Sequence, residues 1–63
     1  QQRGEFLYIF SEKPTKTEVK LYGVDGRLEG WLFRGTIEGE AWLRLPEGVH
    51  VAEAGGRAII VAR

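Results

Sequence analysis

The stretch Thr17–Arg34, TEVKLYGVDGRLEGWLFR, decides how the chain folds, because it holds the strongest turn signal in the sequence. Asp25-Gly26 lies at its centre, between apolar-rich runs, and this dipeptide is typical of a two-residue β-hairpin turn. Such a turn fixes which residues of the two flanking strands face each other. The predicted pairs are Val24 with Arg27, Lys20 with Trp31, and Val19 with Leu32.

Three further turn signals divide the rest of the chain in the same way: Arg34-Gly35, Pro46-Glu47-Gly48 and Gly55-Gly56. The runs between turns are short and rich in β-branched and aromatic residues, which favours strands and not helices. Ser11 to Lys16, with Pro14 inside it, reads as a polar loop. The predicted strands are Glu5–Phe10, Thr17–Val24, Arg27–Arg34, Thr36–Leu45, Val49–Ala54 and Arg57–Ala62.

These strands predict an all-β fold, an antiparallel meander of five or six short strands. The turn registers bring Leu43 near Val51 and Val51 near Ile60, so that one face is aliphatic throughout. Gly30 and Gly39 fall opposite each other on that face, where the missing side chains favour a sharp bend. We therefore expect closure into a small barrel of SH3-like or OB-like size, or a strongly coiled sheet. The expected aliphatic face consists of Val19, Leu21, Leu28, Leu32, Ile37, Ala41, Leu43, Leu45, Val49, Val51, Ala58 and Ile60.

The opposite face is expected to mix aromatic and charged side chains in cross-strand rows. The expected neighbours are Tyr22 with Glu29, Lys20 with Trp31, Glu18 with Phe33, and Arg27 with Trp42. So much apolar surface needs a cover. Three covers fit: the first strand, Phe6–Phe10, which is apolar on both sides; a second copy of the chain; or a ligand. We favour the chain itself or an identical partner, because obligate interfaces resemble protein cores. The candidate binding residues are Lys20, Tyr22, Trp31, Phe33, Trp42 and Arg44.

A nucleic-acid interface is the main alternative. Aromatic rings interleaved with cations, such as Tyr22, Trp31 and Trp42 beside Lys20 and Arg44, resemble the surfaces that bind single-stranded DNA or RNA. However, acidic residues share this face and would repel phosphates. They are Glu18, Glu29, Glu38 and Glu40.

Catalytic signals are weak throughout the chain. There is no Cys, and the one His, His50, is expected near Arg44 as a surface residue and not as a general base. Glu38 and Glu40 share a face, but without a cleft they are interpreted as solvated charges. Neither a phosphate-binding glycine loop nor a set of metal ligands occurs, so we expect no enzyme activity, no metal and no cofactor.

Composition limits the classes of protein that remain. Sixty-three residues support one domain, and nine basic and nine acidic residues cancel, so no long-range field attracts nucleic acid or an anionic membrane. No apolar run approaches the roughly 20 residues of a membrane span. Without a signal segment we expect the cytoplasm, and the absence of Asn, Cys and Met suggests a thermophilic source. The expected function is a self-associating interaction module, or alternatively one accessory domain of a larger protein.

Overall fold

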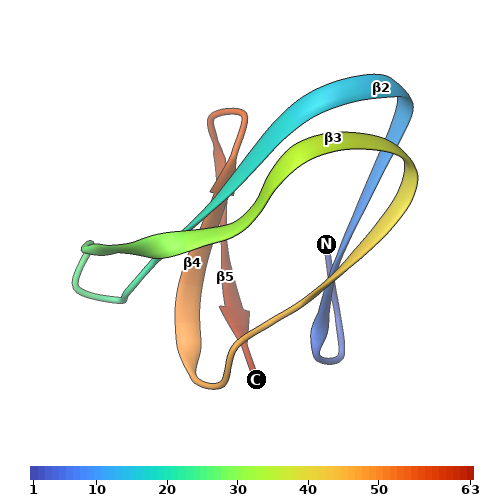
Figure 1. The fold of residues 1–63 in the computed structure, drawn as a ribbon. Helices are drawn as coiled ribbons and strands as arrows, with labels where there is room; N and C mark the ends of the chain where they lie inside the picture. The colour runs from blue at the N-terminus through green and yellow to red at the C-terminus, as the bar shows by residue number, and fades with distance from the viewer.

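The computed structural model describes all 63 residues, and they form one antiparallel sheet of five strands. The strands are β1 (Gln2–Arg3), β2 (Phe6–Tyr22), β3 (Leu28–Arg44), β4 (Val49–Ala54) and β5 (Arg57–Ala62). Figure 1 shows the sheet coiling strongly without closing, so the all-β prediction is confirmed in its coiled-sheet form. The chain forms no helix of the length and apolar character needed to cross a bilayer.

The first four predicted strands are in fact two long ones, β2 and β3, of 17 residues each. The predicted turn at Arg34-Gly35 is wrong, because Gly35 pairs with Thr17 inside the ladder and does not adopt a positive φ. The predicted loop at Ser11 to Lys16 lies within β2. Pro14 falls in a register shift between Ser11 and Thr15, where the absent N–H costs no ladder hydrogen bond.

The hairpin turn between β2 and β3 is one residue longer than the two-residue turn predicted. Gly26 N–H donates to the Gly23 carbonyl over 3.0 Å, and Gly23 N–H donates to the Arg27 carbonyl over 2.8 Å. Gly26 has φ +87°, the left-handed conformation that ends a three-residue hairpin loop. Val24 is therefore not paired with Arg27. A register shift between Leu21 and Tyr22 compensates, so the predicted pairing of Lys20 with Trp31 is confirmed.

The long hairpin bends where its ladder is irregular, and Figure 1 shows it arching across the molecule. Gly39, with φ +78°, pairs with Ser11 at one register shift, and Gly30 pairs with Leu21 beside another. The two glycines are therefore not opposite each other as predicted. Bulges and strand glycines increase local twist, so both positions still contribute to the coiling.

β4 pairs with β2 and not with β3, which precedes it in the sequence. β3 pairs with one edge of β2 along both halves, as Leu7 with Leu43 shows for the first half. β1 pairs with the other edge of β2 at its start, and β4 occupies that edge in the second half, with Leu21 opposite Ala52. The expected proximity of Leu43 and Val51 is wrong, whereas the pairing of Val51 with Ile60 is confirmed.

The core lies inside the coil and is small. Val19, Leu21, Ile37 and Leu45 are buried as predicted. The β4–β5 hairpin has the opposite sidedness from the prediction, because Ala52 and Val61 point inward. The members of the expected aliphatic face that are exposed instead are Leu28, Val49, Ala58 and Ile60. The core cluster consists of Leu7, Val19, Leu21, Leu45, Ala52 and Val61.

Side chains bridge the two ends of the open sheet. The Gln2 amide accepts a hydrogen bond from Ala62 N–H and donates one to the Ala62 carbonyl, so β1 is tied to the end of β5. The Glu5 carboxylate lies 3.5 Å from the Arg63 guanidinium and 3.7 Å from that of Arg44. In a closed barrel β1 and β5 would be paired at this place, and side-chain contacts take the place of that pairing.

Two valines test the position of the core. Val19 has no exposed surface, whereas Val24, at the hairpin tip, is 77% exposed. Val19→Ala is expected to lower the free energy of unfolding by about 2 kcal/mol, through lost burial and the cavity left behind. Val24→Ala is expected to change it by less than about 0.5 kcal/mol. Urea denaturation of both variants measures the difference, and equal effects would contradict this core.

Candidate functional site

The candidate binding residues separate into two groups and one core residue. Lys20, Tyr22 and Trp31 lie together on the convex side of the sheet, while Trp42 and Arg44 lie on the second half of β3. Phe33 packs against the core, contrary to prediction. The cause is the register shift after Val19: Val19 pairs with Phe33 and Lys20 pairs with Trp31, so an extra residue on β3 reverses the side of Phe33.

The first group belongs to a continuous surface formed by directly paired side chains of four strands, which we call the outer face. One row runs through Leu28, Tyr22, Val51 and Ile60. A parallel row runs through Trp31, Lys20, Glu53 and Ala58. Val49 and Ala62 pair beside the first row. Within these rows the charged residues are Lys20 and Glu53, which stand opposite each other, and Glu18 and Arg34 flank the face at Trp31.

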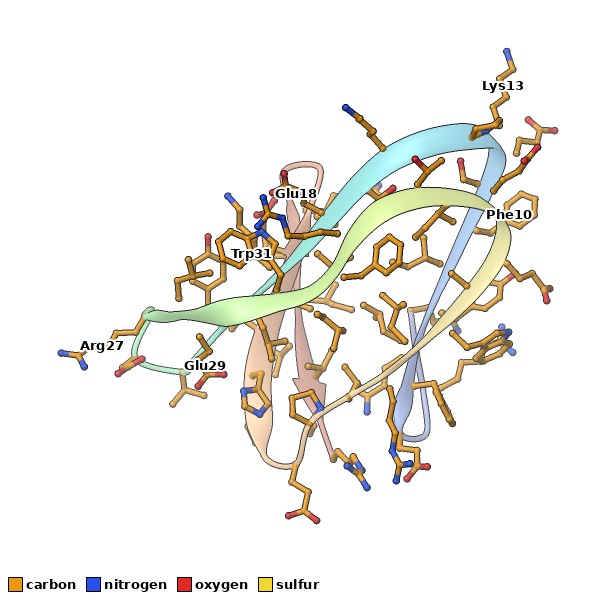
Figure 2. The ribbon with its side chains drawn as sticks, viewed as in Figure 1. Phe10, Lys13, Glu18, Arg27, Glu29 and Trp31 are labelled. Atoms are coloured by element: carbon orange, nitrogen blue, oxygen red, sulfur yellow. The ribbon has the colours of Figure 1, made fainter.

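Trp31 is oriented by its polar neighbours. Its indole N–H donates to the Glu18 carboxylate over 3.1 Å, and the Arg34 guanidinium lies 4.6 Å from the ring centroid. Figure 2 shows Trp31 beside Glu18, away from Arg27 at the hairpin tip. The expected neighbour of Glu18 was Phe33, but its cross-strand partner is Arg34. Trp31 remains partly exposed, so these contacts fix the ring without covering it.

The second group is covered in part by the first strand, one of the three covers considered. Trp42 pairs with Tyr8, not with Arg27, and the two rings are 4.8 Å apart. Phe6 meets the same indole edge-on at 6.4 Å. The Tyr8 hydroxyl donates to Glu40. β2 therefore supplies ring contacts on one side of Trp42, which remains 48% exposed.

His50 joins the start of β3 to the β3–β4 turn, and its hydrogen-bond partners are Glu29 and Glu47 and not Arg44. Its Nδ1 lies 2.6 Å from the Glu29 carboxylate and its Nε2 lies 2.7 Å from the Glu47 carbonyl oxygen. The hydrogen bond to the Glu47 carbonyl raises the pKa of His50, and the Glu29 carboxylate adds to this, while burial opposes it. The Glu29 carboxylate is therefore hydrogen-bonded to His50. The predicted pairing of Glu29 with Tyr22 is wrong, because Tyr22 pairs with Leu28.

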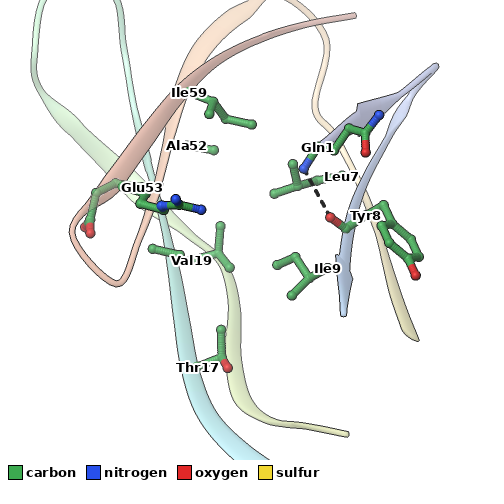
Figure 3. Close-up of a pocket in the computed structure, with 11 residues that line it drawn as sticks. Gln1, Leu7, Tyr8, Ile9, Thr17, Val19, Ala52, Glu53 and Ile59 are labelled. Carbon is green, nitrogen blue, oxygen red and sulfur yellow. Dashed lines mark hydrogen bonds between the residues drawn. The ribbon is translucent and has the colours of Figure 1, made fainter. Parts of the chain in front are cut away.

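A pocket of about 290 Å³ opens at the seam between the first half of β2 and the β4–β5 hairpin. Figure 3 shows Leu7 and Ile9 on one side of it and Ala52 and Ile59 on the other. The N-terminal ammonium of Gln1 donates to the Tyr8 carbonyl at its rim. The lining is mainly apolar. Its two charged residues, Glu53 and Arg57, lie next to the turn of the β4–β5 hairpin.

Other chemical features are few. No three His, Asp or Glu side chains come together as a potential metal site. Comparisons with protein-family models, with curated proteins and with solved structures find no match to this chain.

Sequence reasoning missed the contribution of β4 and β5 to the outer face. β4 is apolar on both sides, with Val49 and Val51 on one and Ala52 and Ala54 on the other, so alternation alone does not give its orientation. The predicted aliphatic face places the larger side chains, Val49 and Val51, inward. The usable signal is size, because the small Ala52 fits where β4 lies beside Leu21 in the core.

The contacts of His50 predict a pH-dependent stability. A His whose pKa is raised by folding stabilises the fold fully below its unfolded pKa of 6.5, and this contribution is lost as the pH rises through the folded pKa. The melting temperature of His50→Gln is therefore expected to lie furthest below that of wild type under about pH 6.5. At alkaline pH the two melting temperatures should become similar. Glu29→Gln should show a weaker form of this trend. A difference independent of pH would contradict this.

Proposed function

We propose that this domain is a non-enzymatic interaction module that associates with a second copy through its outer face. The observation that supports this most directly is the exposure of large apolar side chains on one continuous surface. Leu28 is 48% exposed, Trp31 43%, Val49 52% and Ile60 75%. Contiguous apolar surface of this kind is typical of protein interfaces and is rare on free monomers.

Charge also favours an identical partner. The chain has no net charge, so two copies do not repel each other at long range. Within the outer face, Lys20 and Glu53 are paired across the strands and offset each other. An interface with a two-fold axis uses the same patch on both subunits, and a patch that is apolar and internally neutral is self-complementary.

The contacts of His50 fit a structural role for this residue. Both of its ring nitrogens are engaged, one by the Glu29 carboxylate and one by the Glu47 carbonyl. The function proposed depends on surface complementarity.

Nucleic-acid binding is less well supported by the same geometry. Carboxylates lie beside three of the candidates: Glu18 accepts a hydrogen bond from Trp31, Glu40 accepts one from Tyr8 next to Trp42, and Glu5 lies near Arg44. Stacking surfaces for single strands combine rings with unopposed cations, which attract the phosphates.

The mass of the protein in solution tests the proposal. Size-exclusion chromatography with light scattering at micromolar concentration is expected to find a dimer or a larger species. Trp31→Glu places a charge in the outer face and should lower the mass. Val24→Glu, at the exposed hairpin tip outside that face, is the matched control and should leave the mass unchanged. A monomeric wild type with intact β-sheet circular dichroism would refute self-association.

Tryptophan fluorescence tests the alternative. Adding single-stranded DNA or RNA to the wild type at low ionic strength is expected to leave the emission of Trp31 and Trp42 unchanged, because carboxylates adjoin both clusters. Quenching that weakens as salt is added would instead support nucleic-acid binding.

A further inference from the structure

The outward edge of β5 is not paired with any strand. Gly48 and Arg63 exchange both backbone hydrogen bonds at one end of the β4–β5 ladder. In an antiparallel ladder the direction of the backbone groups alternates, so Val61 and Ile59 bond toward β4 while Ala62, Ile60 and Ala58 point away from it. The free edge therefore offers backbone groups at these three positions.

Both ends of this free edge are closed by side chains. The Gln2 amide satisfies the N–H and the carbonyl of Ala62. At the other end, the Glu53 carboxylate accepts the N–H of Gly56 over 3.1 Å. Between these two caps, Ala58 and Ile60 are left with outward N–H and C=O groups and no partner strand.

Only the first residue of β5, Arg57, is charged, and its side chain lines the pocket beside Ile59. Beyond Arg57 the edge has none of the features that prevent strand addition. Proteins usually protect an edge strand with a Lys, a Pro, a bulge or an inward charge. The segment Ala58–Ala62 reads AIIVA and contains no charge and no Pro. Its pairing with β4 shows no register shift. Such an edge is ready to accept another strand.

We propose that β5 pairs antiparallel with β5 of a second copy, in a register that places the two Ile59 residues opposite each other. Ala58 then faces Ile60 of the other copy, and Ile60 faces its Ala58. Each of these two pairs exchanges two backbone hydrogen bonds. The contact goes beyond the outer-face association proposed above, because it uses the edge of the sheet and not its surface.

The side chains fit this register. On the outer face each large Ile60 stands beside a small Ala58, so both pack without collision. On the inner side, Ile59 lines the mainly apolar pocket, and Ile59 of the second copy approaches its mouth. Residues opposite each other without exchanging hydrogen bonds approach most closely, with Cα atoms roughly 4.5 Å apart. The free edge is therefore complementary to itself, which favours a second copy over an unrelated peptide.

Two separate surfaces, a face and an edge, make the assembly larger than a dimer. Each surface pairs like with like, and a subunit carrying two such interfaces joins two neighbours. The edge contact also places the outer faces of the two copies side by side, which extends the apolar row that ends at Ile60.

Ile60→Pro tests the edge contact directly. The N–H that proline lacks points away from β4 at this position, so the substitution removes no hydrogen bond within the subunit. Ile60→Thr is the matched control. Both variants remove the Ile60 side chain from the outer face, but only Pro removes the N–H. Light scattering is expected to find wild type larger than a dimer, and Ile60→Pro at about half the mass of Ile60→Thr.

Combining this substitution with Trp31→Glu separates the two proposals. Trp31→Glu alone should leave edge-paired dimers, and the double variant should be monomeric. If Ile60→Pro has the wild-type mass, the edge contact is wrong while outer-face association stands. If only Ile60→Pro lowers the mass, the edge is right and the outer face is wrong. A wild type that is monomeric contradicts both.

Hydrogen exchange provides a measurement that needs no variant. In wild type, the amides of Ala58 and Ile60 are expected to exchange more slowly as protein concentration rises, because pairing protects them. The Lys13 amide, in the exposed bend of β2, is the internal control. Exchange of Ala58 and Ile60 that is independent of concentration over the range in which the mass changes would overturn the proposal.

Discussion

The bend in the long β2–β3 hairpin is the constraint from which the remaining structure follows. Two strands of 17 residues are too long to form a flat, two-stranded ribbon that buries a core. Register shifts along β2 and the positive φ of Gly39 bend the ribbon over itself. Its two halves then enclose Leu7 from one arm and Val19 from the other in a single cluster.

The same bend determines where the last two strands go. β3 pairs with one edge of β2 along both halves, and β1 pairs with the other edge at its start, so β4 joins that other edge in the second half. The small Ala52 meets Leu21 on the inside, and Val51 is turned outward with Ile60. An apolar outer face and an uncovered β5 edge both result from this one choice of side.

Short-range signals in the sequence were sufficient for some of these features and not for others. Gly55-Gly56 gave the pairing of Val51 with Ile60, because a tight hairpin turn acts locally. Asp25-Gly26 indicates the position of the turn but not its length, which is three residues and not two. The register shift between Leu21 and Tyr22 nevertheless restores the predicted pairing of Lys20 with Trp31. Arg34-Gly35 resembles a turn, but cross-strand pairing with Thr17 overrides local preference there.

The candidate site was predictable to the same degree. Lys20, Tyr22 and Trp31 share a face as predicted because they flank the hairpin turn. Phe33 was misplaced because a bulge between distant strands leaves no mark in the sequence. The sidedness of β4 depends on which strand it joins, and that depends on the bend. The alternation of β4 does not contain this information, and only the small size of Ala52 indicates the inward side.

Methyl nuclear Overhauser contacts measure the sidedness of β4 and β5 most directly. The structure predicts contacts of Ile60 with Val51, and of Val51 with the Tyr22 ring, together with contacts between Val61 and the core. It predicts none between Ile60 and Leu45 or Val19 of the same subunit. Intramolecular contacts of Ile60 with Leu45 and Val19 would place the large aliphatic side chains inside, and would contradict both the outer face and the free edge derived from it.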